Sequence, residues 1–270
     1  MADDILVSAD WLLQNLSDRS IRIFDIRSPL EYASGHLPNA ILITYERIVD
    51  FDPNRPYLDV ASKERIGELL SEKGVGNDMK VIIYGDRGGA SAAKLFWVLE
   101  MYGANVKILS MPYSVWRAKG YPVTTEKFKP EPAEFVANSH GKDLRVSSDY
   151  IASKIGDSNV VLIDTRSPEE YEGYVASGPR PGRIPGSRNI PWSGGVGDTE
   201  IFKSAAELAK LFEGRGVTKD KEVVCYCQVG ERASHTLLAL RIAGYPNVKI
   251  YDRSFSEWSN NFELPVEVSS

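Results

Sequence analysis

The sequence predicts an α/β protein built from two tandem copies of one domain, each a parallel sheet with helices on both faces. Its 270 residues exceed the usual size of a single domain. An internal repeat divides the chain into halves, and short apolar runs alternate with helical patterns in each half. Hydrophobic residues make up 43% and charged residues 26%, which is typical of a globular protein with a full-sized core.

The repeat is clearest at residues 105–108, where Asn-Val-Lys-Ile recurs at 247–250, an offset of 142 positions. At this offset residues 74–116 align with 216–258 without a gap. Thirteen of these 43 positions are identical, where average composition would give about three by chance. The two halves are therefore copies of one domain.

Upstream of this block, Asp-x-Arg-Ser-Pro at 25–29 recurs at 164–168. The offset then changes by eight residues, which places an insertion in the second half around Gly173–Pro181. A polar stretch interrupted by two prolines follows the first copy. We therefore predict a domain at residues 1–125, a linker at 126–143 and a domain at 144–270.

Short continuous apolar runs in each half indicate strands that are buried on both faces, as in parallel sheets. The predicted strands are Ile21–Asp25, Val81–Tyr84, Val106–Leu109, Val160–Asp164, Val223–Tyr226 and Val248–Tyr251. The predicted helices are Lys63–Lys73, Ser91–Tyr102, Ala205–Glu213 and Arg232–Ala243. Ligands of such sheets bind beyond the carboxyl ends of the strands, so the turns after Tyr84 and Tyr226 are the first places to seek a site.

The turn after the second of these strands carries a cysteine, because residues 227–232 read Cys-Gln-Val-Gly-Glu-Arg. A strand, a glycine turn and a helix start place backbone N–H groups and the positive end of the helix dipole around one point. Arg232 stands on the first turn of that helix. We therefore predict that Cys227 is an exposed thiolate and the catalytic nucleophile, in a turn that binds an anion beside it.

Other conspicuous residues near this turn are assigned structural roles. Cys225 lies inside the strand, and buried cysteines are common in cores. His235 is one turn into the helix and is interpreted as a packing residue, since a thiolate in an anion-binding turn needs no base. Trp116 and Trp258 occupy equivalent places in the repeat and are predicted to pack.

The first copy has the same turn without the chemistry. Gly85 is aligned with Cys227, and Ala90 is aligned with Arg232. This half cannot run a reaction that needs the cysteine.

Composition excludes several other functions. The net charge of −5 and the pI near 5.4 argue against a nucleic-acid or anionic-membrane partner. No apolar run approaches the roughly 18 residues that cross a bilayer, and the acidic start of the sequence lacks the pattern of a secretory signal. The two cysteines supply neither a disulfide framework nor the four ligands of structural zinc. We expect a reducing cytoplasm, no metal and no cofactor.

Four motifs together resemble the tandem-domain rhodanese (thiosulfate sulfurtransferase) family over roughly residues 5–265. They are Cys-x-x-Gly-x-Arg after a core strand, Asp-x-Arg-Ser-Pro-x-Glu-Tyr, Gly-(His/Arg)-(Leu/Ile)-Pro, and Ser-x-x-Glu-Trp near the end. The resemblance implies two rhodanese-like domains, of which the second is catalytic and the first packs against it and closes one wall of the cleft. It also implies that the thiolate takes the sulfane sulfur of a donor such as thiosulfate, releasing sulfite, and that the persulfide then passes its sulfur on. The implied partners are a small-molecule sulfur donor, a thiol or cyanide acceptor, and protein sulfur acceptors.

The resemblance assigns the persulfide to Cys227. It assigns donor binding and persulfide stabilisation to Gln228, Val229, Gly230, Glu231 and Arg232. Arg180, within the insertion, resembles a donor-binding arginine of tandem members, although a solvated surface role is an equal alternative.

Three further positions depart from the family pattern or carry a second interpretation. Arg183 falls where many relatives have histidine and is a further candidate for substrate binding. His36, at the equivalent place in the first half, is interpreted as a capped-turn residue, with a place in the cleft wall as the alternative. Residues 252–254 read Asp-Arg-Ser where many relatives have Asp-Gly-Gly or Asp-Gly-Ser, which argues against a tight glycine turn.

Two other classes of protein use or retain such a turn. Cysteine phosphatases carry Cys-x5-Arg, whereas four residues separate Cys227 from Arg232 here, and Glu231 would repel a dianionic phosphate. A non-catalytic rhodanese-like sensor is disfavoured because the second half keeps its cysteine. Among donors, the loop looks closest to the Cys-Arg-x-Gly-Glu-Arg loops of prokaryotic thiosulfate sulfurtransferases, so we predict thiosulfate, with 3-mercaptopyruvate as the alternative.

Overall fold

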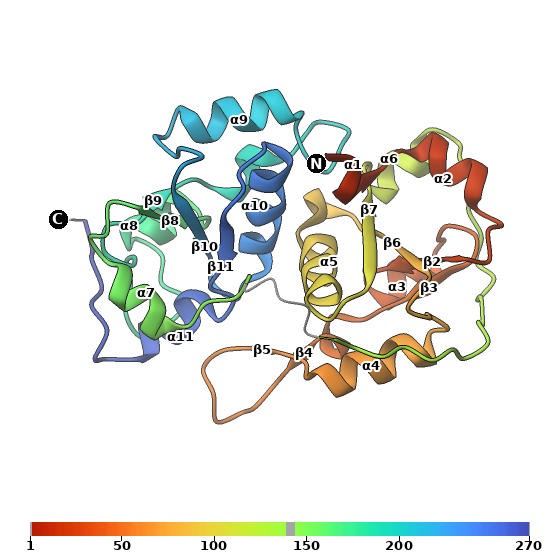
Figure 1. Cartoon of the computed structure of the whole chain (residues 1–270), viewed down its shortest axis with the longest axis horizontal. Helices are drawn as coiled ribbons and strands as arrows, with labels where there is room; N and C mark the ends of the chain where they lie inside the picture. Colours follow the sequence, from red (N-terminus) through yellow and green to blue (C-terminus); the bar gives the residue numbers. More distant parts are fainter. Residues whose placement is uncertain (1, 139–143, 270) are drawn as a thin grey trace.

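The computed structural model describes residues 2–138 and 144–269. Two parallel sheets lie side by side, one in each half of the chain, with helices packed around them (Figure 1). The first sheet has the strand order β1-β7-β6-β2-β3, and the second has the order β11-β10-β8-β9. The predicted α/β class and the tandem domains are confirmed.

The first sheet consists of β1 (Leu6–Val7), β2 (Ile21–Asp25), β3 (Ala40–Leu42), β6 (Lys80–Tyr84) and β7 (Asn105–Leu109), and β4 (Val49–Asp50) and β5 (Asp59–Val60) form a separate antiparallel hairpin. The α-helices of this half are α1 (Ala2–Ile5), α2 (Ala9–Asn15), α3 (Pro29–Ala33), α4 (Lys63–Glu72), α5 (Ala90–Met101) and α6 (Tyr113–Ala118), with 3-10 turns η1 (Tyr45–Arg47) and η2 (Arg87–Gly89). These strands are buried on both faces, as the continuous apolar runs predict.

The second sheet consists of β8 (Val160–Asp164), β9 (Arg188–Asn189), β10 (Glu222–Tyr226) and β11 (Val248–Ile250). Its helices are α7 (Ser148–Lys154), α8 (Pro168–Glu172), α9 (Ala205–Glu213), α10 (Glu231–Ile242) and α11 (Ser254–Asn260), with the 3-10 turn η3 (Trp192–Gly195). Every predicted strand and helix is present, with ends that differ by at most two residues.

The central strands of the two sheets pair in the same register, so that equivalent residues end them. Asp25 pairs with Tyr84 across β2 and β6, and Asp164 pairs with Tyr226 across β8 and β10. The carboxyl ends of the central strands therefore meet at one edge of each sheet. The cysteine turn leaves that edge in the second half.

Helices α5 and α10, which the repeat makes equivalent, pack against each other between the two sheets (Figure 1). Side chains around most of the circumference of both helices are buried. One continuous cluster of buried apolar residues joins the halves through them. At its margin Arg241 makes a two-point ion pair with Glu100, at 2.6 and 2.8 Å. Because α10 begins at the cysteine turn, this packing sets the turn against the first half.

The hairpin loop between β4 and β5 reaches toward the second half beside α11 (Figure 1). Asp59 on β5 accepts hydrogen bonds from both Arg145 and Arg253 of the second half. Ion pairs that are fully exposed to solvent contribute little to the association of two surfaces. These side chains are partly buried, so their ion pairs contribute more. The hairpin thus fastens the lower edge of the interface.

The described part of the predicted linker, residues 126–138, is extended and contains no helix or strand. It runs along the first half and is bound there to Ser71 of α4. The amide of Ala133 donates a hydrogen bond to the Ser71 carbonyl, and the amide of Phe135 donates one to the Ser71 hydroxyl. Positions 139–143 of the predicted linker fall outside the described residues. Among the helices that the structure describes, none has the length and apolar character needed to cross a bilayer.

Candidate active site

Cys227 is the first residue after β10, at the point where the chain turns into α10. The amide of Gly230 donates a hydrogen bond to its Sγ at 3.1 Å. Gly230 has φ +82°, and a Cβ there would overlap the main chain of Asp252. Only glycine therefore closes this turn without strain. Since the first N–H groups of α10 also lack partners inside the helix, the turn is built to stabilise negative charge on sulfur.

The prediction that Cys227 is exposed is wrong, because its relative exposure is 0%. The turn itself is polar, as the sequence indicates, but the first half covers it. Ser91, on the first turn of α5, donates a hydrogen bond to Glu231 of the cysteine turn at 2.5 Å. The sulfur lies inside the apolar cluster that joins the two halves. A polar turn is therefore buried by a partner surface that local sequence cannot show.

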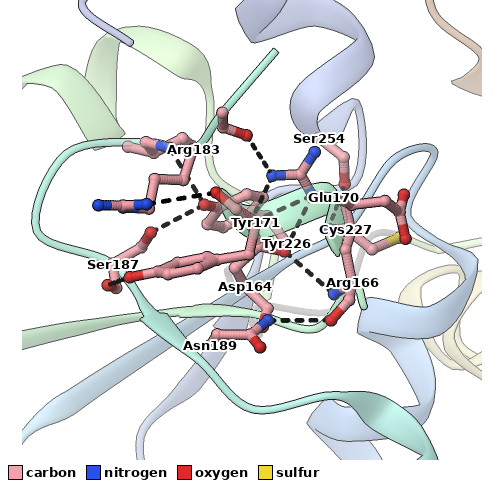
Figure 2. Close-up of polar contacts among 12 residues, drawn as sticks. Asp164, Arg166, Glu170, Tyr171, Arg183, Ser187, Asn189, Tyr226, Cys227 and Ser254 are labelled. Carbon is pink, nitrogen blue, oxygen red and sulfur yellow. Dashed lines mark hydrogen bonds and ion pairs between the residues drawn. The ribbon is translucent and has the colours of Figure 1, made fainter. Parts of the chain in front are cut away.

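Ser254 replaces the glycine turn of many relatives and has its own function in the structure. It adopts φ +56°, a left-handed conformation that is strained for a residue with a side chain. Its Oγ accepts a hydrogen bond from the amide of Cys227 at 3.1 Å and donates to the carbonyl of Tyr251 at 2.8 Å. Figure 2 shows Ser254 beside Cys227. The strained serine thus fixes the backbone of the nucleophile, and the sequence argument did not identify it.

Arg232 is held by a carboxylate from the Asp-x-Arg-Ser-Pro-x-Glu-Tyr motif. Its two Nη atoms donate to Glu170 at 2.6 and 2.9 Å. Burial alone would lower the pKa of Arg232, but Glu170 and the negative charge of Cys227 raise it overall. Burial likewise opposes the ionisation of Glu170, yet Arg232 and the amide of Ser167 lower its pKa. The pair is therefore fully charged at neutral pH.

The same motif anchors the strand end through a buried ion pair. Asp164, the last residue of β8, accepts hydrogen bonds from the guanidinium of Arg166 at 2.6 to 3.1 Å (Figure 2). Arg166 also donates to the carbonyl of Gly182 at 2.7 Å and lies over the ring of Phe255. The amide of Phe255 in turn donates to the carbonyl of Cys227 at 3.0 Å. Asp164 and Arg166 thus connect the sheet to the backbone of the nucleophile.

Gln228 holds the insertion against the cysteine turn, because its Nε2 donates to the carbonyl of Ser177 and to the hydroxyl of Ser256. Val229 and Gly230 complete the turn between β10 and α10, and Glu231 is the first residue of α10. The structure therefore brings the predicted loop residues together around Cys227. Their roles toward a substrate stay predictions.

Arg180 and Arg183 are engaged elsewhere. The guanidinium of Arg180 donates to four main-chain carbonyls at the end of α11 and beyond, at 2.6 to 2.9 Å. Arg183 pairs with Glu267 at 2.5 Å and with Glu172, which fastens the carboxyl-terminal segment to its domain. Neither side chain is brought to Cys227 by these contacts, so their assignment to donor binding stays a prediction that the geometry does not favour.

His36 has in the first half the structural role that Arg183 has in the second. Its two ring nitrogens lie 2.9 and 3.1 Å from the carbonyls of Tyr32 and Glu126, and its ring stacks on Tyr32. Its backbone pairs with Thr124 as that of Arg183 pairs with Glu267. His36 therefore fastens the segment that leaves the first domain, in agreement with a structural interpretation.

The residues predicted to pack are all fully buried. Trp116 and Trp258 donate their indole N–H groups to equivalent carbonyls, of Pro122 and Pro265. His235 stacks on Phe202, and burial lowers its pKa to about 4, so it is neutral at pH 7. Burial raises the pKa of the Cys225 thiol, which stays protonated.

The turn of the first half, residues 85–89, serves the interface. Gly89 has φ +78°, and a Cβ there would overlap the side chain of Ile201 from the second half. Ile201 in turn donates its amide to the carbonyl of Ser110 at 2.7 Å. The copy without the cysteine thus packs its turn against the second half.

Comparison with known proteins agrees with this geometry. The rhodanese-like domain matches residues 8–119 and again 147–261. The chain is 36% identical to the sulfur carrier protein TtuD of Thermus thermophilus, over 97% of this chain and 96% of that protein. It is 33% identical to a protein of Mycolicibacterium smegmatis named putative thiosulfate sulfurtransferase, over 99% of both chains.

Among solved structures, SseA of Escherichia coli superposes with a TM-score of 0.82 at 30% identity, over 92% of this chain and 98% of that chain. SseA is described with the rhodanese fold and mechanism of 3-mercaptopyruvate sulfotransferases. Two matched domains, near full-length relatives and a shared fold lead to one conclusion. The chain belongs to the rhodanese family of sulfurtransferases.

Proposed function

We propose that this protein moves the sulfane sulfur of thiosulfate to a thiophilic acceptor through a persulfide on Cys227. The observation that carries the proposal is the turn that directs the Gly230 amide at the sulfur of Cys227, with α10 starting behind it. The Arg232–Glu170 pair and Ser254 hold this turn in place. A thiolate placed in this way is a nucleophile beside donors suited to an anionic leaving group.

The reaction has two steps that conserve charge. The Cys227 thiolate attacks the outer sulfur of thiosulfate, the S–S bond of the donor breaks, and its electron pair leaves with sulfite. The persulfide on Cys227 keeps one negative charge, which the amides of the turn stabilise. Cyanide or a thiolate then attacks the outer sulfur of the persulfide and leaves the Cys227 thiolate free again.

The two relatives' names point to different acceptors and donors. The sulfur carrier TtuD supports a protein acceptor, and the name of the mycobacterial relative supports thiosulfate as donor. The likeness to SseA supports 3-mercaptopyruvate as the second candidate. Both cysteines are free thiols, which suits a reducing compartment, and we therefore propose the cytoplasm.

The choice of donor is tested by steady-state kinetics. We expect kcat/KM for thiosulfate to exceed that for 3-mercaptopyruvate by at least about tenfold, because the amides of the turn and the positive end of the α10 dipole attract a dianion more strongly than a carboxylate. Thiocyanate formation from cyanide measures the first, and pyruvate release measures the second. A preference for mercaptopyruvate would overturn the choice of donor but leave sulfur transfer through Cys227 intact.

A second prediction concerns Glu170, which has a matched counterpart in the first half. Glu170→Gln removes the charge that orients Arg232, and we therefore expect kcat/KM for thiosulfate to fall by about tenfold. Glu31 makes the same capping box with Ser28, but Ala90 stands where the second half has Arg232. Glu31→Gln should therefore leave the kinetics unchanged. Equal effects of the two variants would show that only helix capping was lost.

A further inference from the structure

Lys94 is a buried lysine at the interface between the two halves. It lies on α5 of the first half, and its relative exposure is 2%. A Cβ at Gly230 would lie 3.0 Å from its Nζ, so the ammonium lies against the turn that holds Cys227. A lysine is rarely buried to this extent unless a partner compensates the cost of losing water.

The partners that Lys94 has in the structure do not satisfy it. The nearest acidic group among the described residues is Asp252, whose Oδ2 is 3.9 Å from Nζ, beyond hydrogen-bond distance. That Oδ2 is itself buried without a hydrogen bond to any described residue. No hydrogen bond joins the ammonium to the described residues, although its charge lies 4.6 Å from the ring of Trp97. The three N–H donors of the ammonium therefore lie beside the turn without a hydrogen-bond acceptor among the described residues.

A second donor of the first half faces the same group of charges. The Oη of Tyr45 is buried, and the described residues offer it no hydrogen-bond partner. Burial raises the pKa of Tyr45, and the negative charges of Glu231, Cys227 and Asp252 raise it further. The phenol therefore keeps its proton as a donor. Two side chains of the first half, Lys94 and Tyr45, thus carry donors that have no acceptor among the described residues.

Among the described residues, three arginines of this region of the second half pair with carboxylates. Arg232 is bound at two points by Glu170, as described above. Arg145 pairs with Asp252 and Asp59, and Arg253 pairs with Asp59 and Glu257. Lys94, by contrast, has only the Asp252 carboxylate, 3.9 Å away, as an ion-pair partner among the described residues. Burial lowers the pKa of Lys94 and the charge of Arg145 adds to that fall, whereas the negative charges of Asp252, Cys227 and Glu231 oppose it.

We propose that Lys94 is a substrate-binding residue of this active site, which binds the anionic end of the sulfur donor and so selects doubly charged donors. The inference rests on the proposed function and extends it to the first half. When the Cys227 thiolate meets thiosulfate, three negative charges come together, and all three remain after transfer, on the persulfide and the departing sulfite. A buried ammonium whose donors are unfilled stabilises that accumulation more than it stabilises the empty site.

The experiment compares two sulfur donors that differ in charge. Thiosulfate carries two negative charges, and methanethiosulfonate carries one and releases a sulfinate by the same attack on its outer sulfur. Lys94→Met removes the charge and keeps the length of the side chain. We expect it to lower kcat/KM for thiosulfate about 100-fold but kcat/KM for methanethiosulfonate only about tenfold. Lys94→Arg, which keeps the charge, should preserve the ratio between the donors.

The control is Lys63→Met, which removes one exposed positive charge from α4 of the same half. It should change neither rate, which excludes an effect of net charge. Thermal unfolding shows which variants fold, and Lys94→Gln provides the neutral variant if Lys94→Met does not. The donor ratio is independent of the amount of active enzyme, so partial unfolding does not imitate the result.

An equal loss with both donors would show that Lys94 only supports the turn, and no loss with either would show that it is dispensable. Each of these results would overturn the proposal, as would a Lys94→Arg variant that loses the ratio as fully as Lys94→Met. Failure of the wild-type protein to turn over thiosulfate would instead refute the proposed function.

Discussion

Replacing Cys227 by serine is expected to abolish sulfur transfer, with kcat/KM for thiosulfate falling by at least about 10⁴-fold. A hydroxyl stays protonated at neutral pH and cannot carry a persulfide, so the covalent step is lost altogether. The turn itself should persist, because Ser254 and Gly230 contact the backbone and the γ atom of residue 227 in ways that oxygen also allows. The rate of thiocyanate formation at thiosulfate concentrations well below KM, with cyanide in excess, measures the loss.

Cys225, which lies in β10 two residues before Cys227, is the matched control. It is fully buried, and burial raises its pKa, so it takes no part in transfer. Cys225→Ser should keep most of the activity, although a hydroxyl in an apolar core costs about 1–3 kcal/mol of stability. Equal losses of activity in the two variants would show that the cysteines act as a pair, contrary to this account.

The largest effect on stability is expected from Asp164→Ala. The change leaves Arg166 buried without its counter-charge, and breaking a buried ion pair in this way costs about 3–5 kcal/mol. Burial alone would lower the pKa of Arg166, but the hydrogen bonds and the charge of Asp164 raise it overall. Chemical denaturation followed by tryptophan fluorescence measures the change in the free energy of unfolding.

Two further variants make this prediction specific. Asp164→Ala combined with Arg166→Met removes both charges and should recover most of the lost stability, because no charge is then buried unpaired. Asp25→Ala breaks the equivalent pair with Arg27 in the first half, which has almost the same contacts, and should cost a similar amount. A cost below about 1 kcal/mol for Asp164→Ala would contradict the view that this pair anchors the strand end.

The sequence predicts those features that local pattern determines. The parallel strands, the helices α4, α5, α9 and α10 and the position of the cysteine turn follow from apolar runs, helical periods and glycine. The repeat shows that the first half has the turn without the nucleophile. Strands of two or three residues such as β1, β3 and β9 were missed, because so few residues carry no period.

The sequence does not predict what covers the turn. The burial of Cys227 depends on the first half, and Lys94 lies on a helix of the other domain. The sequence likewise does not show the partners of Arg180 and Arg183, whose contacts with carbonyls and carboxylates do not favour the predicted donor binding. From the sequence, Ser254 is only a departure from a glycine, whereas in the structure its hydroxyl accepts a hydrogen bond from the Cys227 amide. Each of these depends on contacts between distant segments.

The central claim is that Cys227 carries the transferred sulfur, and mass spectrometry of the protein after reaction with thiosulfate tests it directly. The account predicts a gain of one sulfur atom on the peptide that contains Cys227, reversed by cyanide, and no gain in Cys227→Ser. A sulfur adduct on Cys225 in place of Cys227, or no adduct with any sulfur donor, would contradict it.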